Sequence, residues 1–356
     1  MAVPLFATTL ERHHARLAEA LSRVVESGHY ILGPEVEGFE AEFARYLGAR
    51  HVVGVANGTD AITIALRALG VGHGDEVVVP SFTFYASVEA IANAGATPVF
   101  CDVDPGSFCV TEATVRAALT PRTRAVMPVH LFGNVAPDLG DLGVPVLEDA
   151  AQAAGAGRDG IRAGAMAHAA TFSFFPSKNL PCLGDGGAIV TSSDEVAERA
   201  RTLRFHGSKD KRTFTEVGYN SRLDELQAAA LRVLLPELDG WVAARRRAAA
   251  AYEREGLGEH VRLPRAVDGA IHAYHLYVVR SGAADELSDT LAERGIGARG
   301  YYRVPAHRQP AMRDFTAPEL PGTEEAARTN LALPMGTQLG DEAIREVVAA
   351  CASRSS

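Results

Sequence analysis

A lysine beyond the end of a short apolar run is the residue of this sequence best placed for covalent chemistry. Residues 171–175, Thr-Phe-Ser-Phe-Phe, are typical of a β-strand, Pro176 ends its ladder, and Lys178 follows in a loop. Ligands collect at the carboxyl ends of strands in open α/β sheets. An amine partly withdrawn from water there has a lowered pKa and can form a Schiff base with an aldehyde or ketone. The plain alternative is a solvated surface lysine.

Lysines are scarce in the chain, which narrows the search for a reactive amine. Lys178, Lys209 and Lys211 are the only lysines among 35 basic residues. An arginine-rich coding bias explains this scarcity, but it still leaves few candidates for any chemistry that needs a primary amine.

A second polar pair follows the apolar run that begins at Val144. Asp149 stands at the end of this predicted strand, and Gln152 stands three positions further on. A carboxylate under a pyridine nitrogen keeps that nitrogen protonated, so that the ring withdraws electrons, and a nearby amide can hydrogen-bond a phenolic oxygen. The alternative is an aspartate that caps the next helix.

Gly58, Thr59 and Asp60 stand where a predicted strand turns into a predicted helix. Backbone N–H groups at a helix N-terminus bind phosphate, and glycine permits close approach. Because the side chain of Asp60 repels an anion, we expect this residue to contribute its backbone. Simple capping of the helix by Thr59 is the alternative. The segment matches neither the GxxxxGK[ST] nucleotide loop nor the GxGxxG dinucleotide fingerprint.

Phe84 follows another predicted strand and offers an aromatic face on which a flat ring can stack, although such aromatics are more often part of a core. The chain has no GxSxG elbow of the serine hydrolases, and its histidines have no HExxH-like spacing, so no metal site is predicted. The joint order of a phosphate turn, an aromatic, an acid and a lysine is more informative than any one of them.

These residues need a sheet whose strands end at one edge. Short apolar runs alternate with helical segments such as Gly33–Gly48, which predicts an α/β fold with a mainly parallel, seven-stranded sheet covered on both faces. A predicted helix ends at Pro236, where we place the end of a large domain, 1–236, followed by a smaller α+β domain, 237–356. The apolar runs begin at His51, Glu76, Pro98, Ala125, Val144, Thr171 and Gly187.

Composition excludes several kinds of partner. The 356 residues carry a formal net charge of −9 without long runs of one sign, so neither nucleic acid nor an anionic membrane is an expected partner. No apolar stretch reaches the roughly 18–20 residues of a membrane span, and the N-terminal residues do not match a secretion signal. The four cysteines lack metal-like spacing and are expected to be reduced, which predicts a cytoplasmic protein.

Several segments, taken in order, resemble the sugar aminotransferases of the DegT/DnrJ/EryC1/StrS family, fold-type I enzymes that use pyridoxal 5'-phosphate (PLP). The resemblance runs from about Gly33 to the C-terminus and implies an aspartate aminotransferase-like fold and transamination through PLP and its amine form, PMP. The segments are GDEVVVPSFTFYA, PRTRAVMPVHLFG, EDAAQ, FSFFPSKNL, GDGGAIVT, LRFHG and GYNSRLDELQAA. Some relatives have histidine in place of the lysine and catalyse dehydration, so Lys178 favours transamination.

The resemblance gives each candidate around the cofactor ring a role. Lys178 is expected to form the internal aldimine and then to move a proton between the cofactor and the sugar carbon. Asp149 is expected to pair with the pyridine nitrogen and Gln152 with the 3-hydroxyl group, while Phe84 lies over the ring.

The resemblance also implies a phosphate site that two subunits share. The residues expected to hold the phosphate within one subunit are Gly58, Thr59, Asp60 and Ser173. Asn220 is expected to reach it from the neighbouring subunit, which implies an obligate homodimer with shared active sites.

The implied substrates are an NDP-keto-deoxysugar, expected to be TDP-linked, and L-glutamate as amino donor, in deoxyamino-sugar biosynthesis. The segment GDGG favours a 3-keto over a 4-keto sugar, and the segment after Gly300 resembles a sugar pocket, in which Tyr301, Tyr302 and His307 are expected to contact the substrate. Pro181 stands where the family pattern has glycine, directly after the segment SKNL. A UDP sugar, a 4-keto sugar and a cyclitol ketone remain open. A PLP-binding sugar sensor without turnover is another alternative. An α/β oxidoreductase is disfavoured, because the chain lacks the dinucleotide fingerprint.

Overall fold

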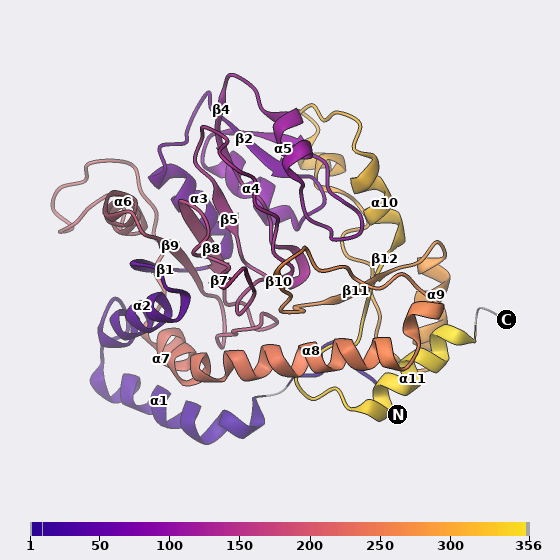
Figure 1. The fold of residues 1–356 in the computed structure, drawn as a ribbon. Coiled ribbons are helices and arrows are strands. Elements are labelled where there is room, and N and C mark those ends of the chain that lie inside the picture. The colour runs from indigo at the N-terminus through magenta and orange to yellow at the C-terminus, as the bar shows by residue number, and fades with distance from the viewer. Residues whose placement is uncertain (1, 9, 354–356) are drawn as a thin grey trace.

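Seven strands form the centre of the molecule, and they pair as a group of four and a group of three (Figure 1). The structure, a computed structural model, describes residues 2–8 and 10–353. The group of four has the order β1 (His51–Val55), β9 (Gly187–Thr191), β8 (Ala169–Ser173) and β5 (Leu147–Asp149). The group of three has the order β3 (Thr97–Cys101), β2 (Glu76–Pro80) and β4 (Thr123–Val126).

Strand direction in this sheet is mixed. Strands β5 and β8 are parallel, as are β2, β3 and β4, whereas β9 is antiparallel to both of its neighbours. Two isolated parallel bridges, Val126 with Val146 and Val129 with Asp149, join the two groups. The expected single ladder of seven strands is therefore interrupted between β4 and β5. Pro128 and Pro145 lie in this seam, and because proline has no N–H group, each removes a donor from the ladder.

Helices cover both faces of the sheet. Helices α3 (Gly58–Ala68), α4 (Tyr85–Asn93) and α6 (Asp194–Arg204) pack together on one face, and α2 (Pro34–Leu47) and α7 (Glu225–Leu234) on the other. Successive strand side chains point to opposite faces, so Val52 belongs to the second core and Val53 to the first. Two further helices lie outside these layers, with α1 (His14–Ser27) against α7 and α5 (Glu112–Ala118) against β3.

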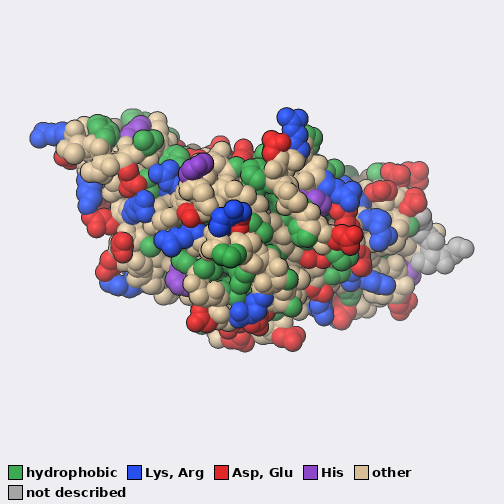
Figure 2. All heavy atoms as spheres, turned by 90° about the horizontal axis from the view of Figure 1, so that it is seen from above, with side chains coloured by type: hydrophobic (Ala, Val, Ile, Leu, Met, Phe, Trp, Pro, Cys, Tyr) green, Lys and Arg blue, Asp and Glu red, His purple; other side chains and the backbone are tan. Residues whose placement is uncertain are grey.

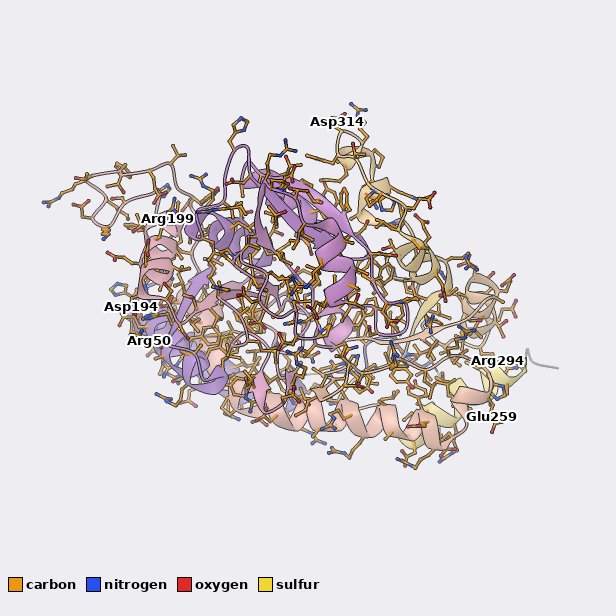
Figure 3. All side chains as sticks on the ribbon, turned by 45° about the horizontal axis from the view of Figure 1, so that its top comes forward. Arg50, Asp194, Arg199, Glu259, Arg294 and Asp314 are labelled. Atoms are coloured by element: carbon orange, nitrogen blue, oxygen red, sulfur yellow. The ribbon has the colours of Figure 1, made fainter. Side chains whose placement is uncertain are left out.

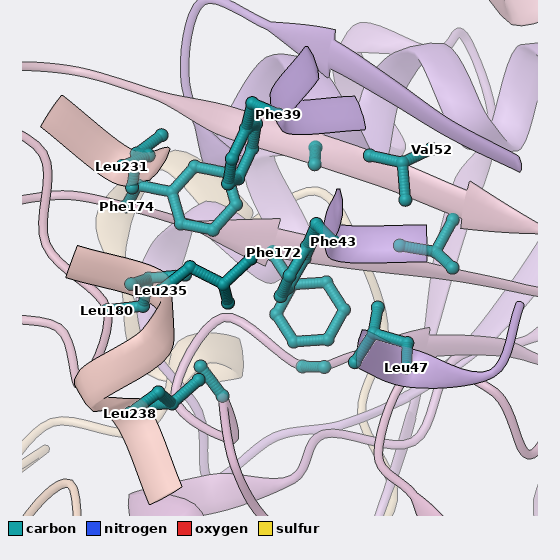
Figure 4. Close-up of a cluster of buried hydrophobic side chains, with 14 of the residues drawn as sticks. Phe39, Phe43, Leu47, Val52, Phe172, Phe174, Leu180, Leu231, Leu235 and Leu238 are labelled. Carbon is teal, nitrogen blue, oxygen red and sulfur yellow. The ribbon is translucent and has the colours of Figure 1, made fainter. Parts of the chain in front are cut away.

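Aromatic packing between α2 and β8 fixes the strand that precedes Lys178. Phe43 and Phe172 meet edge to face with ring centroids 5.1 Å apart, and Phe39 and Phe174 do so at 5.3 Å (Figure 4). All four rings are fully buried. Each such pair contributes about 0.5–1.5 kcal/mol beyond the burial of its area, so the end of β8 has a well-defined position.

The C-terminal part is built on a two-stranded antiparallel sheet, β11 (Tyr277–Arg280) and β12 (Asn330–Leu333). The elements around it are α9 (Ala284–Glu293), α10 (Pro321–Thr329) and α11 (Asp341–Ala352). A small sheet beside the main one consists of β6 (Gly157–Arg158), β7 (Ile161–Arg162) and β10 (Ala270–Ile271).

Helix α8 (Leu238–Arg254) runs along the base of both parts in Figure 1. Its first half contributes Leu238 to the core around α2, and its second half contributes Tyr252 to the C-terminal core. The N-terminal residues also join the C-terminal part, since Val3 bridges Ile296. The division at residue 236 remains a prediction, but the small part takes in these N-terminal residues as well.

The surface seen in Figure 2 carries acidic and basic side chains that are intermixed over the whole face. All four cysteines are buried and unpaired. Among residues 2–8 and 10–353, no helix has the length and the apolar character needed to cross a membrane.

Candidate active site

A cavity of about 840 Å³ opens at the carboxyl ends of β5 and β8. Its wall combines the first turn of α3, the turn after β2, and the segment 299–309 of the C-terminal part, of which residues 299–304 and Gln309 face the cavity. Segments far apart in the chain therefore meet around it. The predicted site residues that line it are Gly58, Thr59, Phe84, Asp149, Gln152, Ser173, Lys178, Tyr301 and Tyr302.

Lys178 is half-buried in this cavity, in the loop expected from the sequence. Its backbone N–H donates to the carbonyl of Phe175 at 2.8 Å, which closes a tight turn after β8. Burial lowers the pKa of the amine to about 8, although the negative charge of Asp149 opposes the shift. At neutral pH about a tenth of such amines are uncharged and able to attack a carbonyl, against well under a thousandth for an ordinary lysine.

This pKa can be measured by reductive methylation of the cofactor-free protein, because only the neutral amine reacts. The rate at Lys178, read by peptide mass spectrometry, is expected to rise about tenfold per pH unit and to level off near pH 8, whereas an ordinary lysine with a pKa of about 10.4 reacts faster still above that pH. The Asp149→Asn variant should move the midpoint to lower pH. A wild-type midpoint at about pH 10 would contradict the assignment.

The carboxyl group of Asp149 is buried and held in one orientation. Its Oδ2 accepts a hydrogen bond from Ser87 Oγ at 2.7 Å, and its Oδ1 accepts one from the backbone N–H of Ala151 at 3.1 Å. Oγ1 of Thr83 lies 2.9 Å from Oγ of Ser87 and orients the Ser87 hydroxyl through a hydrogen bond. Since a carboxylate offers about four acceptor positions, Asp149 can still accept from a donor in the cavity.

Gln152 and Tyr302 line the cavity together and are joined by a hydrogen bond. The amide oxygen of Gln152 accepts from the backbone N–H of Phe132 at 2.7 Å, and its amide nitrogen donates to the hydroxyl of Tyr302 at 3.0 Å. Burial raises the pKa of Tyr302. Phe84 lies nearby, with its ring centroid 5.9 Å from that of Tyr302 and with 54% of its surface exposed, so its ring is available for stacking.

The first turn of α3 meets the end of β8 closely. A Cβ atom at position 58 would lie 2.8 Å from the Cβ of Ser173, so only glycine fits there. The helix is capped by Asn57, whose side chain accepts from the N–H of Asp60 at 2.8 Å, rather than by Thr59. Because a helix leaves its first N–H groups without intrahelical partners, Gly58 and Thr59 can donate to an anion beside the Ser173 hydroxyl.

Three predicted residues lie outside the cavity lining. The N–H of Asp60 is already used by the cap. His307 bonds to Ser81, with 2.6 Å between Nδ1 and Oγ. Asn220 is exposed, and its side-chain oxygen accepts from the guanidinium of Arg222. The contacts of these three residues with cofactor or substrate therefore stay predictions.

The cavity also contains residues that the sequence did not single out. His275 is buried beside Lys178, and its Nδ1 has no hydrogen-bond partner among the described residues. Burial lowers the pKa of this imidazole strongly, and the charges of Lys178 and Arg245 add to the effect. Asp185 and Arg299 line the cavity as well. Within the described ranges, no cluster of three or more His, Cys, Asp or Glu is arranged to hold a metal ion.

The chain is similar to known proteins over nearly its whole length. A "Pleiotropic regulatory protein" of Geobacillus stearothermophilus is 46% identical over 350 residues, which cover 95% of this chain and 94% of that protein. The dTDP-3-amino-3,4,6-trideoxy-alpha-D-glucose transaminase of Streptomyces venezuelae is 47% identical over 339 residues, 92% of this chain and 89% of that one.

Solved structures agree on the fold. The crystal structure of S. venezuelae DesV in complex with a ketimine intermediate matches with a TM-score of 0.95 and 44% identity, over 99% of this chain and 98% of that chain. This confirms the α/β fold predicted by the resemblance. Residues 11–352 match the model of the DegT/DnrJ/EryC1/StrS aminotransferase family, and the chain belongs to that family.

Proposed function

We propose that this chain is a PLP-dependent transaminase that moves the amino group of L-glutamate to C3 of a TDP-linked 3-keto-deoxysugar, in deoxyamino-sugar biosynthesis. The observation that carries the proposal is the position of the Lys178 amine in one cavity with the buried carboxyl group of Asp149. The transaminase of S. venezuelae, whose name specifies a 3-amino sugar nucleotide, supports the choice of C3. The GDGG segment at Gly184–Gly187 supports it as well.

The residues around the cavity fit the cofactor. The amine of Lys178 is suited to hold its aldehyde, the carboxyl group of Asp149 its ring nitrogen, and the ring of Phe84 its flat face. The N–H groups of Gly58 and Thr59, together with the hydroxyl of Ser173, are suited to its phosphate, in a turn too close for a Cβ at position 58. When bound, PLP supplies an aldehyde that condenses with amines and a ring that withdraws electrons from the carbon next to nitrogen.

The chain itself then supplies proton transfer and orientation. Nζ of Lys178 holds or releases a proton near neutral pH, since its pKa lies close to the working pH of a general acid or base. Asp149 is oriented by Ser87 and Ala151. Residues 299–304 and Gln309 line the cavity from the C-terminal part, and Tyr302 is held there by Gln152.

The direct test is an assay of the purified protein with PLP, L-glutamate and either the TDP-3-keto or the TDP-4-keto deoxysugar. Mass spectrometry and NMR of the product identify the aminated carbon. Amination of the 3-keto sugar is expected. Amination at C4 alone would overturn the choice of carbon, and tight binding of the sugar nucleotide without any product would favour a sensor instead of an enzyme.

We also propose a homodimer with shared sites, in which Asn220 contacts the cofactor phosphate of the partner subunit. Phe205 and Asn220 bridge each other at the base of a loop that projects from the molecule beside α6 (Figure 1). This loop exposes Phe214 and Val217, which are 59% and 83% exposed. Exposed apolar side chains of this kind are typical of a surface that a partner covers. Because the four cysteines are buried and unpaired, we place the dimer in the cytoplasm.

Asn220→Ala is expected to weaken cofactor binding about 10- to 100-fold, because a hydrogen bond to a charged group contributes roughly 1.5–3 kcal/mol. The measurement is the Kd of the cofactor by fluorescence titration.

A mixed dimer tests whether the contact crosses the interface. One subunit carries Lys178→Ala and the other carries Asn220→Ala, with different affinity tags for purification. If Asn220 acts on the partner's site, both defects fall in one site and the other site is intact, so about half of the wild-type activity returns. Activity no higher than that of the Asn220→Ala homodimer contradicts shared sites.

A further inference from the structure

The part of the cavity wall formed by residues 299–309 is attached at both of its ends. At its start, Arg299 and Ala332 of β12 exchange two backbone hydrogen bonds, of 3.1 and 2.8 Å. The N–H of Tyr301 also donates to the side chain of Asn330 at 2.6 Å. The start of this wall is therefore fixed to the C-terminal part of the molecule.

The end of the wall is attached to Ser81, the first residue after β2. Ala306 donates its N–H to the carbonyl of Ser81 at 2.9 Å, and His307 donates its own N–H to Ser81 Oγ at 3.2 Å. The same Oγ lies 2.6 Å from Nδ1 of His307. Because Oγ accepts from the backbone, its proton is free to be donated to Nδ1. The remaining nitrogen, Nε2, lies 3.4 Å from the carboxylate of Glu324 in α10.

This Ser–His–Glu arrangement is not nucleophilic. Ser81 has no exposed surface, and neither Ser81 nor His307 lines the cavity. The arrangement does connect two sides of the cavity, because the turn that begins at Ser81 continues into Thr83 and Phe84, which line it. Tyr301 and Tyr302 line the cavity from the wall that His307 holds, and the ring centroid of Tyr302 lies 5.9 Å from that of Phe84 in this turn.

We propose that His307 is a positioning residue: its hydrogen bond from Ser81 sets the distance between residues 299–309 and the turn after β2, and thereby the affinity for the keto sugar. The proposal rests on the proposed function. This role does not need the direct contact between His307 and the substrate that the sequence led us to expect, and that contact stays a prediction.

Donation from the Ser81 hydroxyl to Nδ1 requires a neutral imidazole, which makes the wall sensitive to acid. Burial lowers the pKa of His307, and of the charged groups around it Glu324 and Asp102 oppose that shift while Arg308 adds to it. His307 is therefore neutral at and above neutral pH. When the pH falls towards the lowered pKa, Nδ1 gains a proton and can only donate to Ser81 Oγ. The buried hydroxyl of Ser81 then loses the acceptor for its own proton, which weakens the contact. The KM for the sugar nucleotide should then rise on the acid side.

Two substitutions distinguish the roles of the two imidazole nitrogens of His307. The amide of His307→Asn carries an acceptor near the position of Nδ1, and the amide of His307→Gln carries one near the position of Nε2. We expect His307→Gln and Ser81→Ala to raise the KM for the keto sugar about fivefold, with kcat and cofactor affinity unchanged. His307→Asn should keep the wild-type KM and lose the rise at low pH. Equal KM values in Asn and Gln variants would overturn the proposal.

Hydrogen exchange gives a readout that does not depend on activity. Amides of residues 299–309 should exchange faster in His307→Gln than in the wild type or in His307→Asn. Faster exchange with an unchanged KM would show that this hydrogen bond does not set the affinity for the sugar. Unchanged exchange would show that the hydrogen bond between His307 and Ser81 does not hold residues 299–309. If the wild type aminates no keto sugar, the proposed function fails, while the exchange data still decide whether His307 holds the wall.

A matched control is available in β1, at the edge of the main sheet far from β2. His51 Nε2 lies 2.6 Å from the carboxylate of Asp194, which Figure 3 places at the outer edge of the molecule beside Arg50. His51→Asn removes a histidine contact of the same length without touching the cavity. It should leave both the KM and the exchange of residues 299–309 unchanged.

Discussion

Lys178→Ala is expected to lower kcat for transamination by about 10²–10⁴-fold, the range that general acid–base catalysis contributes, or more because the covalent attachment is lost as well. The variant removes from the cavity the half-buried amine of Lys178, whose pKa of about 8 suits it to move a proton near neutral pH. Cofactor binding should survive, because the residues suited to the phosphate and the ring are untouched. The measurements are single-turnover rates and a titration with PLP.

Borohydride separates attachment from binding in the same variant. After reduction and denaturation, the wild-type peptide that contains Lys178 should carry the added mass of the cofactor, and the alanine variant should release its cofactor completely. Lys209→Ala is the matched control, since Lys209 pairs with Glu198 on the surface and does not line the cavity. Full activity in Lys178→Ala, or added mass at Lys209, would refute the assignment.

Local sequence was enough to predict these two groups of the site. Lys178 and Asp149 each follow an apolar run, and the position of a residue at a strand end depends mainly on the strand before it. Each of the predicted runs corresponds to a strand, because buried strands need continuous apolar residues. The helix expected at Gly33–Gly48 is also present, with Pro34 in its first turn and Gly48 after its last residue.

Contacts between distant segments could not be predicted from the local sequence. The bond between His307 and Ser81 joins residues 226 positions apart, and nothing in the local pattern of either residue indicates the other. The same holds for His275, which lines the cavity in a segment whose backbone N–H groups at Ala273 and Leu276 donate to the distant carbonyls of Gly133 and Phe132. The cap of α3 is a nearer case: Asn57 and Thr59 are both good capping residues, and only the observed backbone of Asn57 decides between them.

Asp149→Asn is expected to lower kcat by about 10²-fold, because an amide cannot keep the ring nitrogen of the cofactor protonated and a charge-assisted hydrogen bond contributes roughly 1.5–3 kcal/mol. The fold should tolerate the change. The amide oxygen can take the position that accepts from Ala151, and the amide nitrogen can then face Ser87 Oγ, which is able to turn and accept. The change in unfolding free energy should therefore stay within about 1 kcal/mol.

The decisive comparison is between Asp149→Asn and Ser87→Ala. Ser87 does not need to touch the cofactor to matter: its hydroxyl orients Oδ2 of Asp149 at 2.7 Å, and it also lies 2.9 Å from Thr83. Ser87→Ala leaves the charge and removes only one orienting bond, so kcat should fall less than about tenfold. If instead both variants lose the same activity, the orientation of the carboxyl group matters more than its charge. If Asp149→Asn keeps full activity, the ring nitrogen is protonated without this residue, and the charge of Asp149 does not contribute to catalysis.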